Sequence, residues 1–95
     1  MINGFSDKAT KDLFNRKFVR HLSPAIQRLA CWKLLLIDGV ERLDDLRIPP
    51  GNRLEKLSGD LSGKYSIRIN DQLGIIFSWR ENNAYEVKIT DYHKG

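Results

Sequence analysis

Near the end of the sequence stand three consecutive residues, Asp91, Tyr92 and His93, that supply a carboxylate, an aromatic ring and an imidazole. Metal-free RNA cleavage requires a proton acceptor for the ribose 2′-OH, a proton donor for the leaving 5′-oxygen and fixed charge beside the phosphate. The imidazole of His93 titrates near neutrality and can act as acid or base, while Tyr92 can stack on a nucleobase. The triplet is therefore a candidate nuclease site, and a simple strand cap is the alternative.

Cations are predicted to lie beside this triplet. Side chains alternate across a strand, so Lys64 and Arg68 project to one side of their segment, as Lys88 and Tyr92 do on a later segment. If the apolar residues of both segments face the helices, these polar residues share the open side of the sheet. The alternative is a solvated sheet surface without a ligand.

The strands themselves are predicted from a hydrophobic pattern that repeats every two residues. Apolar and polar residues alternate in the three segments 64–70, 74–79 and 85–92, and short polar turns separate them. The apolar positions expected to face the core are Tyr65, Ile67, Ile69, Ile75, Phe77, Trp79, Tyr85, Val87 and Ile89. Three strands joined by short turns form an antiparallel meander.

Two helices are predicted before these strands. Residues 2–5 form a short edge strand, after which Ser6-Asp7 caps a helix that runs to about Lys17. The apolar stripe of this helix consists of Ala9, Leu13, Phe14 and Phe18.

The second helix begins with Ser23 as N-cap and Pro24 as its first residue, and it ends near Gly39. Its stripe of Ile26, Leu29, Ala30, Ile37 and Val40, interrupted by Lys33, is typical of a core-facing surface. Leu43 and Leu46 are expected to add a further turn before the proline- and glycine-containing loop 48–52.

The order β-α-α-β-β-β predicts a single α+β domain over residues 1–95, with two N-terminal helices packed on one face of a mostly antiparallel sheet. The net charge of +4 suits a polyanionic partner. The single Cys31 is interpreted as a buried thiol, and His21 as a surface or interhelix residue. No leader, membrane span, zinc-ligand spacing, P-loop or GxGxxG motif is found, so we expect a cytoplasmic protein without metal or cofactor.

Several segments together resemble the HigB killer proteins of the RelE/ParE toxin superfamily. These segments are Gly-Asn-Arg-Leu-Glu-Lys-Leu-Ser-Gly-Asp at 51–60, Tyr-Ser-Ile-Arg-Ile-Asn-Asp-Gln at 65–72, and Asp-Tyr-His at 91–93. The likeness covers essentially the whole chain, including Met1-Ile2 and Phe5 at its start and Arg-Ile-Pro-Pro-Gly-Asn-Arg from Arg47. Each motif is weak alone, but jointly they are specific.

The resemblance implies a RelE-like fold and a type II toxin that enters the ribosomal decoding site and cleaves mRNA. It implies a HigA-like helix-turn-helix antitoxin as partner, with DNA contacted only through that antitoxin. By this likeness Asp91, Tyr92 and His93 are catalytic, and Arg68 faces the phosphate. His93 is assigned to proton transfer, Tyr92 to stacking on a base, and Asp91 to orienting its neighbours. The expected RNA-binding residues are Arg53, Lys56, Lys64 and Lys88, of which Arg53 and Lys56 are the weaker because they only flank the matching segment.

The chain departs from its relatives after the Asn-Asp-Gln turn. Many relatives continue with Trp-Arg, whereas this sequence has Leu73-Gly74. Three explanations are open: Lys64 or Lys88 substitutes for the missing charge, the toxin is weakened, or the sequence was altered so that it can be produced safely. A non-catalytic protein that blocks the ribosome is therefore an alternative function, as is a co-repressor acting with the antitoxin.

Overall fold

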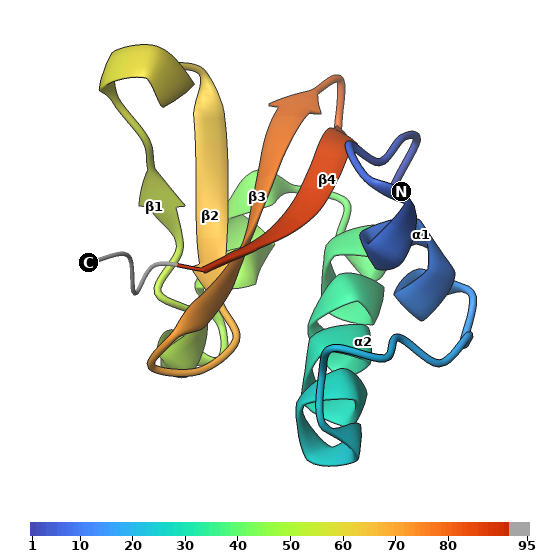
Figure 1. Cartoon of the computed structure of the whole chain (residues 1–95). Helices are drawn as coiled ribbons and strands as arrows, with labels where there is room; N and C mark the ends of the chain where they lie inside the picture. The colour runs from blue at the N-terminus through green and yellow to red at the C-terminus, as the bar shows by residue number, and fades with distance from the viewer. Residues whose placement is uncertain (92–95) are drawn as a thin grey trace.

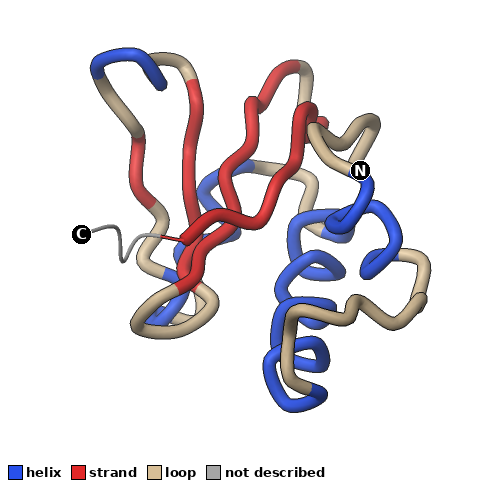
Figure 2. The backbone as a smooth tube through the Cα atoms, in the orientation of Figure 1, coloured by secondary structure: helices blue, strands red, loops and turns tan. Residues whose placement is uncertain are grey.

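Within residues 1–91, which the structure describes, the computed structural model has two α-helices on one side of a four-stranded sheet (Figure 1). The strands are β1 (Glu55–Lys56), β2 (Lys64–Arg68), β3 (Leu73–Arg80) and β4 (Asn83–Asp91), and each pairs antiparallel with the next. Figure 2 shows α1 and α2 together on one side of the sheet, which leaves the other side without an α-helical layer. The predicted α+β architecture is confirmed.

The first helix, α1 (Lys8–Phe14), is shorter than predicted. The Asp7 side chain caps it by accepting a hydrogen bond from the Thr10 amide at 2.8 Å. The helix ends three residues early because Arg16 adopts a left-handed φ of 68°. Phe18 is consequently no longer part of the helical stripe, and it is 72% exposed rather than packed as expected.

The second helix, α2 (Pro24–Gly39), has the predicted boundaries, and the Ser23 hydroxyl accepts from the Ile26 amide. Two residues of its predicted pattern are placed differently. Leu29 is exposed, so its assignment to the core was wrong, whereas Lys33 is buried. The helix thus turns Lys33 inward, toward the side chain of Asn52 in the loop that follows α2.

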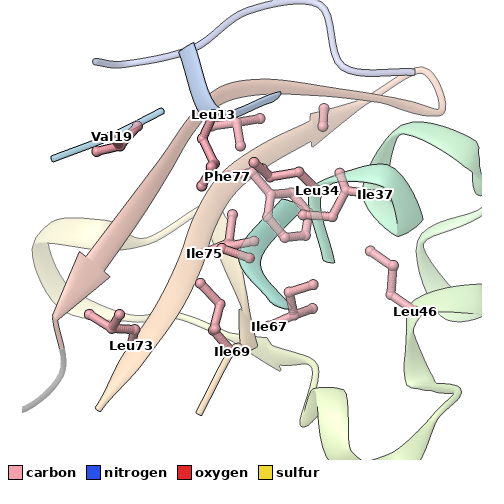
Figure 3. Packing of buried hydrophobic residues seen from close by; sticks show 13 residues of the cluster. Leu13, Val19, Leu34, Ile37, Leu46, Ile67, Ile69, Leu73, Ile75 and Phe77 are labelled. Carbon is pink, nitrogen blue, oxygen red and sulfur yellow. The ribbon is translucent and has the colours of Figure 1, made fainter. Parts of the chain in front are cut away.

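The core lies between α2 and the sheet. Leu34 and Ile37 of α2 face Phe77 and Ile75 of β3 and Ile67 of β2 (Figure 3), and all five are fully buried. Burying side chains of this size contributes roughly 1.5–3 kcal/mol each. The predicted inward sets of β2 and β3 are therefore confirmed, with Trp79 and Tyr65 partly buried at the margin of the cluster.

The sheet differs from the prediction at both edges. β1 is an additional short strand, paired to β2 through Glu55 opposite Ser66. The predicted N-terminal edge strand is reduced to two isolated parallel bridges with β4, Ile2 opposite Ala84 and Phe5 opposite Val87. The N-terminal segment still covers the outer edge of β4.

A bulge in β4 changes which side chains face the core. Glu86 has a φ of 53°, and the register with β3 shifts between Ile76 and Ser78. As a result Tyr85 lies opposite Ser78 on the side of the sheet away from the helices. The prediction that Tyr85 faces the core with Val87 was therefore wrong.

Two short 3₁₀ helices, η1 (Leu43–Arg47) and η2 (Pro50–Asn52), connect α2 to β1, and η3 (Gly59–Leu61) connects β1 to β2. Leu43 and Leu46 thus do form a further turn. Cys31 is half-buried rather than buried. Among residues 1–91, no helix is both long and apolar enough to cross a membrane.

Candidate active site

The outer face of the sheet, defined here as the side away from α1 and α2, carries the predicted cations. Arg68 lies opposite Gly74, and Gly74 lies opposite Thr90 on β4. Lys64 lies opposite Ser78, and Lys88 lies opposite Ile76. Directly opposed residues of an antiparallel pair share a face, so Lys64, Arg68 and Lys88 all belong to the outer face.

Arg68 is held by the turn that follows β2. Its Nε donates to the carbonyl of Asn70 at 3.1 Å, and its Nη2 donates to the carboxylate of Asp71. These bonds use two of the five N–H donors of a guanidinium. The side chain is 30% exposed, so the turn fixes its orientation without burying its charge.

A cleft of about 240 Å³ lies beside this guanidinium, lined by Arg53, Glu55, Arg68 and Asp71. We call it the arginine cleft. Glu55 comes from β1, where it pairs with Ser66 and so lies on the outer face. Lys56 pairs with Tyr65 and lies on the opposite side of β1, so the structure does not bring it into this cleft.

A buried polar contact fixes the loop that leads to Arg53. Asn52 is fully buried, and its side-chain amide donates to the carbonyls of Leu46 at 3.0 Å and Ile48 at 3.4 Å. Its side-chain carbonyl accepts from the ammonium of Lys33. Arg53 follows directly, in a left-handed conformation with φ 48°. The loop that delivers Arg53 to the arginine cleft is thus anchored to α2.

Lys64 is not a free cation. Its Nζ lies 2.6 Å from Glu86 Oε1, and Ser78 Oγ donates to the same oxygen at 3.2 Å. The hydrogen bond from Lys64, followed by that from Ser78, holds the pKa of the Glu86 carboxyl below its usual value. Glu86 therefore stays anionic and offsets the charge of Lys64.

Asp91, the last residue of β4, lies on the other side of the sheet. It pairs with Leu73, which is buried on the helix side, and its carboxylate accepts from Gln72 Nε2 at 3.1 Å. It lines a cleft of about 440 Å³ together with His21, which is exposed. Tyr92 and His93 lie outside the described residues, so their positions relative to Arg68 stay a prediction.

The outer face is less cationic than the sequence predicted. Four of the predicted cations, Arg53, Lys64, Arg68 and Lys88, lie on or beside it, but Asp71 pairs with Arg68 and Glu86 pairs with Lys64. Alternation indicated the side that Lys64, Arg68 and Lys88 take, but it did not show that Asp71 pairs with Arg68 or that Glu86 pairs with Lys64.

Sequence reasoning overlooked two acidic residues of this face. Glu55 belongs to the segment matched by resemblance, and its position between Arg53 and Lys56 was the available signal. Glu86 alternates with Tyr85 and Val87, so the pattern placed it on the open face with Lys88, but its pairing with Lys64 of β2 has no sequence signal. Among residues 1–91, no three His, Cys, Asp or Glu side chains are grouped so that they could hold a metal ion.

The fold is that of the RelE-like toxins. A chain of the heterotetrameric YoeB-YefM toxin-antitoxin complex from Staphylococcus aureus superposes with a TM-score of 0.61 at 23% identity, covering 99% of both chains. YafQ from E. coli superposes with a TM-score of 0.58 at 14% identity, covering 97% of this chain and 94% of that one.

The sequence comparison is more specific. Residues 3–93 match the family described as RelE-like toxin of type II toxin-antitoxin system HigB. Toxin HigB-1 of Vibrio cholerae serotype O1 is 38% identical over 91 residues, which is 95% of each chain. An uncharacterized protein of Haemophilus influenzae is 43% identical over 61 residues, covering 64% of this chain and 59% of that protein. The chain belongs to the HigB-like family of type II toxins.

Proposed function

We propose that this toxin is a ribosome-dependent endoribonuclease that cleaves mRNA in the decoding site and so stops translation. The observation that carries the proposal is the arginine cleft, where the guanidinium groups of Arg53 and Arg68 line one solvent-open hollow on the outer face together with the carboxylates of Glu55 and Asp71. Fixed cations of this kind stabilise the charge that develops on a phosphate during cleavage. The working site is in the cytoplasm, where ribosomes are.

The reaction proposed is attack of the ribose 2′-oxygen on the adjacent phosphorus. The 2′-O–P bond forms as the P–O5′ bond breaks, which leaves a 2′,3′-cyclic phosphate and a free 5′-hydroxyl. Arg68 and Arg53 face the phosphate, and Glu55 accepts the 2′-OH proton. His93 gives a proton to the leaving oxygen, Tyr92 stacks on a base and Asp91 orients them. Lys56, Lys64 and Lys88 contact other parts of the RNA and of the ribosome.

The partner proposed is a HigA-like helix-turn-helix antitoxin, through which the complex reaches DNA. Membership of a toxin-antitoxin family supports an antitoxin partner, as does the structural likeness to a toxin-antitoxin complex. A gel-shift comparison of the antitoxin with and without this protein tests the co-repressor role.

Mapping of mRNA 5′ ends after induction tests the nuclease function. We expect discrete cleavages within codons for the parent protein, strongly reduced cleavage for Arg68→Ala and His93→Ala, and parental cleavage for the control Arg20→Ala on an exposed loop. Parental growth arrest and cleavage by Arg68→Ala and His93→Ala together contradict the assigned roles.

A second candidate is a protein that blocks the ribosome without cutting. Gly74 favours it, because this residue lies opposite Arg68 and the resemblance to the HigB killer proteins implies an arginine at its position. Stalled translation without new 5′ ends supports this blocking function.

A further inference from the structure

A second hollow on the outer face is lined by residues from Lys64 on β2 to Thr90 on β4. It has a volume of about 320 Å³, and its lining includes Leu61, Lys64, Ile76, Glu86 and Lys88. We call it the Glu86 pocket. Lys64 and Arg68 are four residues apart on β2, which corresponds to about 13 Å along the strand. A single RNA strand that passes Arg68 along this face can therefore also reach the Glu86 pocket.

The carboxylate in this pocket is fixed and charged. The Glu86 side chain lies on the outer face, where Oε1 accepts from Lys64 Nζ at 2.6 Å and Ser78 Oγ at 3.2 Å. No residue among 1–91 donates a hydrogen bond to Oε2. One carboxylate oxygen is thus held by the protein while the other remains available as an acceptor.

The surroundings of this oxygen suit a nucleobase better than a phosphate. A phosphate would be repelled by the Glu86 carboxylate, whereas a base can offer N–H donors to it. Ile76 is partly exposed and Leu61 is exposed, so both offer apolar surface to the flat face of a base. Lys88 can offset the charge of a neighbouring phosphate, because no acidic side chain among the described residues forms an ion pair with it.

We propose that the Glu86 pocket binds one base of the mRNA strand, and that Glu86 Oε2 accepts a hydrogen bond from the exocyclic amino group of that base. Cytosine, adenine and guanine carry such a group. Uracil instead presents carbonyl oxygens on either side of its one ring N–H, and these repel a carboxylate. Glu86 is then a specificity-determining residue that disfavours uracil at one position near the cut. This inference rests on the proposed function for its ligand, RNA.

The test is a map of cleavage sites on a reporter mRNA with randomised codons, translated on purified ribosomes. For the parent protein we expect uracil to be depleted about tenfold at one fixed position relative to the cut, a value within the range of one base-edge contact. Glu86→Gln should abolish this depletion, because a glutamine amide can both accept from an amino group and donate to a carbonyl. The control Glu41→Gln removes the same charge from an exposed residue outside the pocket and should retain the parental map.

The outcomes separate this inference from the proposed function. Absence of cleavage by the parent protein contradicts the proposed function itself. Cleavage with no uracil depletion, or with the same depletion in Glu86→Gln, overturns the role of Glu86 and leaves the nuclease proposal standing. If Glu86→Gln cuts too slowly to map, binding of the parent protein and the variant to hexamers of cytidylate and uridylate decides. A tenfold preference for the cytidylate hexamer that the parent shows and Glu86→Gln lacks supports the inference. Equal binding of the two hexamers by the parent overturns it.

Discussion

The ammonium of Lys33 on α2 donates a hydrogen bond to the side-chain carbonyl of Asn52, a contact buried between the helix and the loop that precedes β1. Lys33 is only 6% exposed, and its Nζ also lies 5.0 Å from the centre of the Trp32 ring. The same Asn52 side chain donates to two backbone carbonyls of the loop. Lys33, Asn52 and the two carbonyls thus form a small hydrogen-bonded network within an otherwise apolar layer.

We expect Asn52→Ala to destabilise the protein by about 3 kcal/mol. The substitution leaves the buried ammonium of Lys33 and the loop carbonyls without partners, and a buried polar or charged group without a hydrogen bond is costly. Urea unfolding followed by fluorescence of the two tryptophans measures the change. Asn82→Gly is the control, since this exposed turn residue already has a φ of 64° that glycine tolerates.

A double-mutant cycle tests whether the two residues act as a pair. Removing both with Lys33→Met and Asn52→Leu removes the buried donor and its acceptor together, so we expect the double variant to lose less stability than the two single losses combined. Additive losses would show that the contact contributes nothing of its own.

Lys33 should also make the free energy of unfolding depend on pH in the alkaline range. Burial lowers the pKa of its ammonium below the ordinary 10.5. Between the folded-state pKa and 10.5 the unfolded chain therefore binds more protons, so stability from this residue rises with pH across that window. Unfolding measured from neutral pH to pH 10 should show the rise in the parent protein relative to Lys33→Met. A constant difference between the two proteins contradicts the shifted pKa.

The fold was predictable where it depends on capping residues and on the periodicity of apolar residues. The Ser23-Pro24 start of α2 and the inward alternation of Ile67, Ile75 and Phe77 depend on neighbours in the sequence. The end of α1 and the bulge at Glu86 were not predictable, because each depends on a positive φ at an ordinary residue. Such conformations are stabilised by tertiary contacts that a periodic pattern does not contain.

The site was predictable in part for the same reason. Alternation placed Lys64, Arg68 and Lys88 on one face, and the register agrees. Alternation does not describe how a turn folds back on a strand, so the pairing of Arg68 with Asp71 was missed. The burial of Lys33 was missed because its partner Asn52 is nineteen residues away in a loop.

Asp71→Asn should strengthen RNA binding at low salt. The Asp71 carboxylate, almost fully exposed, offsets the guanidinium of Arg68, and its removal leaves the charge of Arg68 without this counterion. We expect severalfold tighter binding of a short single-stranded RNA at low ionic strength and little difference at high salt, because exposed charges are screened. Asp44→Asn is a matched control, since Asp44 forms a similar exposed pair with Arg47 away from the cleft. Equal affinities for the parent and Asp71→Asn at low salt would show that Asp71 does not limit the charge of Arg68.

Gly74→Arg should raise toxicity and the rate of mRNA cleavage. Gly74 lies between Arg68 and Thr90 on the outer face, so an arginine there adds a cation on the strand next to Arg68. Since one donor that stabilises transition-state charge can be worth on the order of a hundredfold in rate, we expect a gain of roughly ten- to a hundredfold. Gly74→Gln adds a long side chain without the charge, and it separates an electrostatic gain from a change in strand stability. A rate unchanged by Gly74→Arg, or raised equally by both variants, would mean that the missing arginine does not attenuate this toxin.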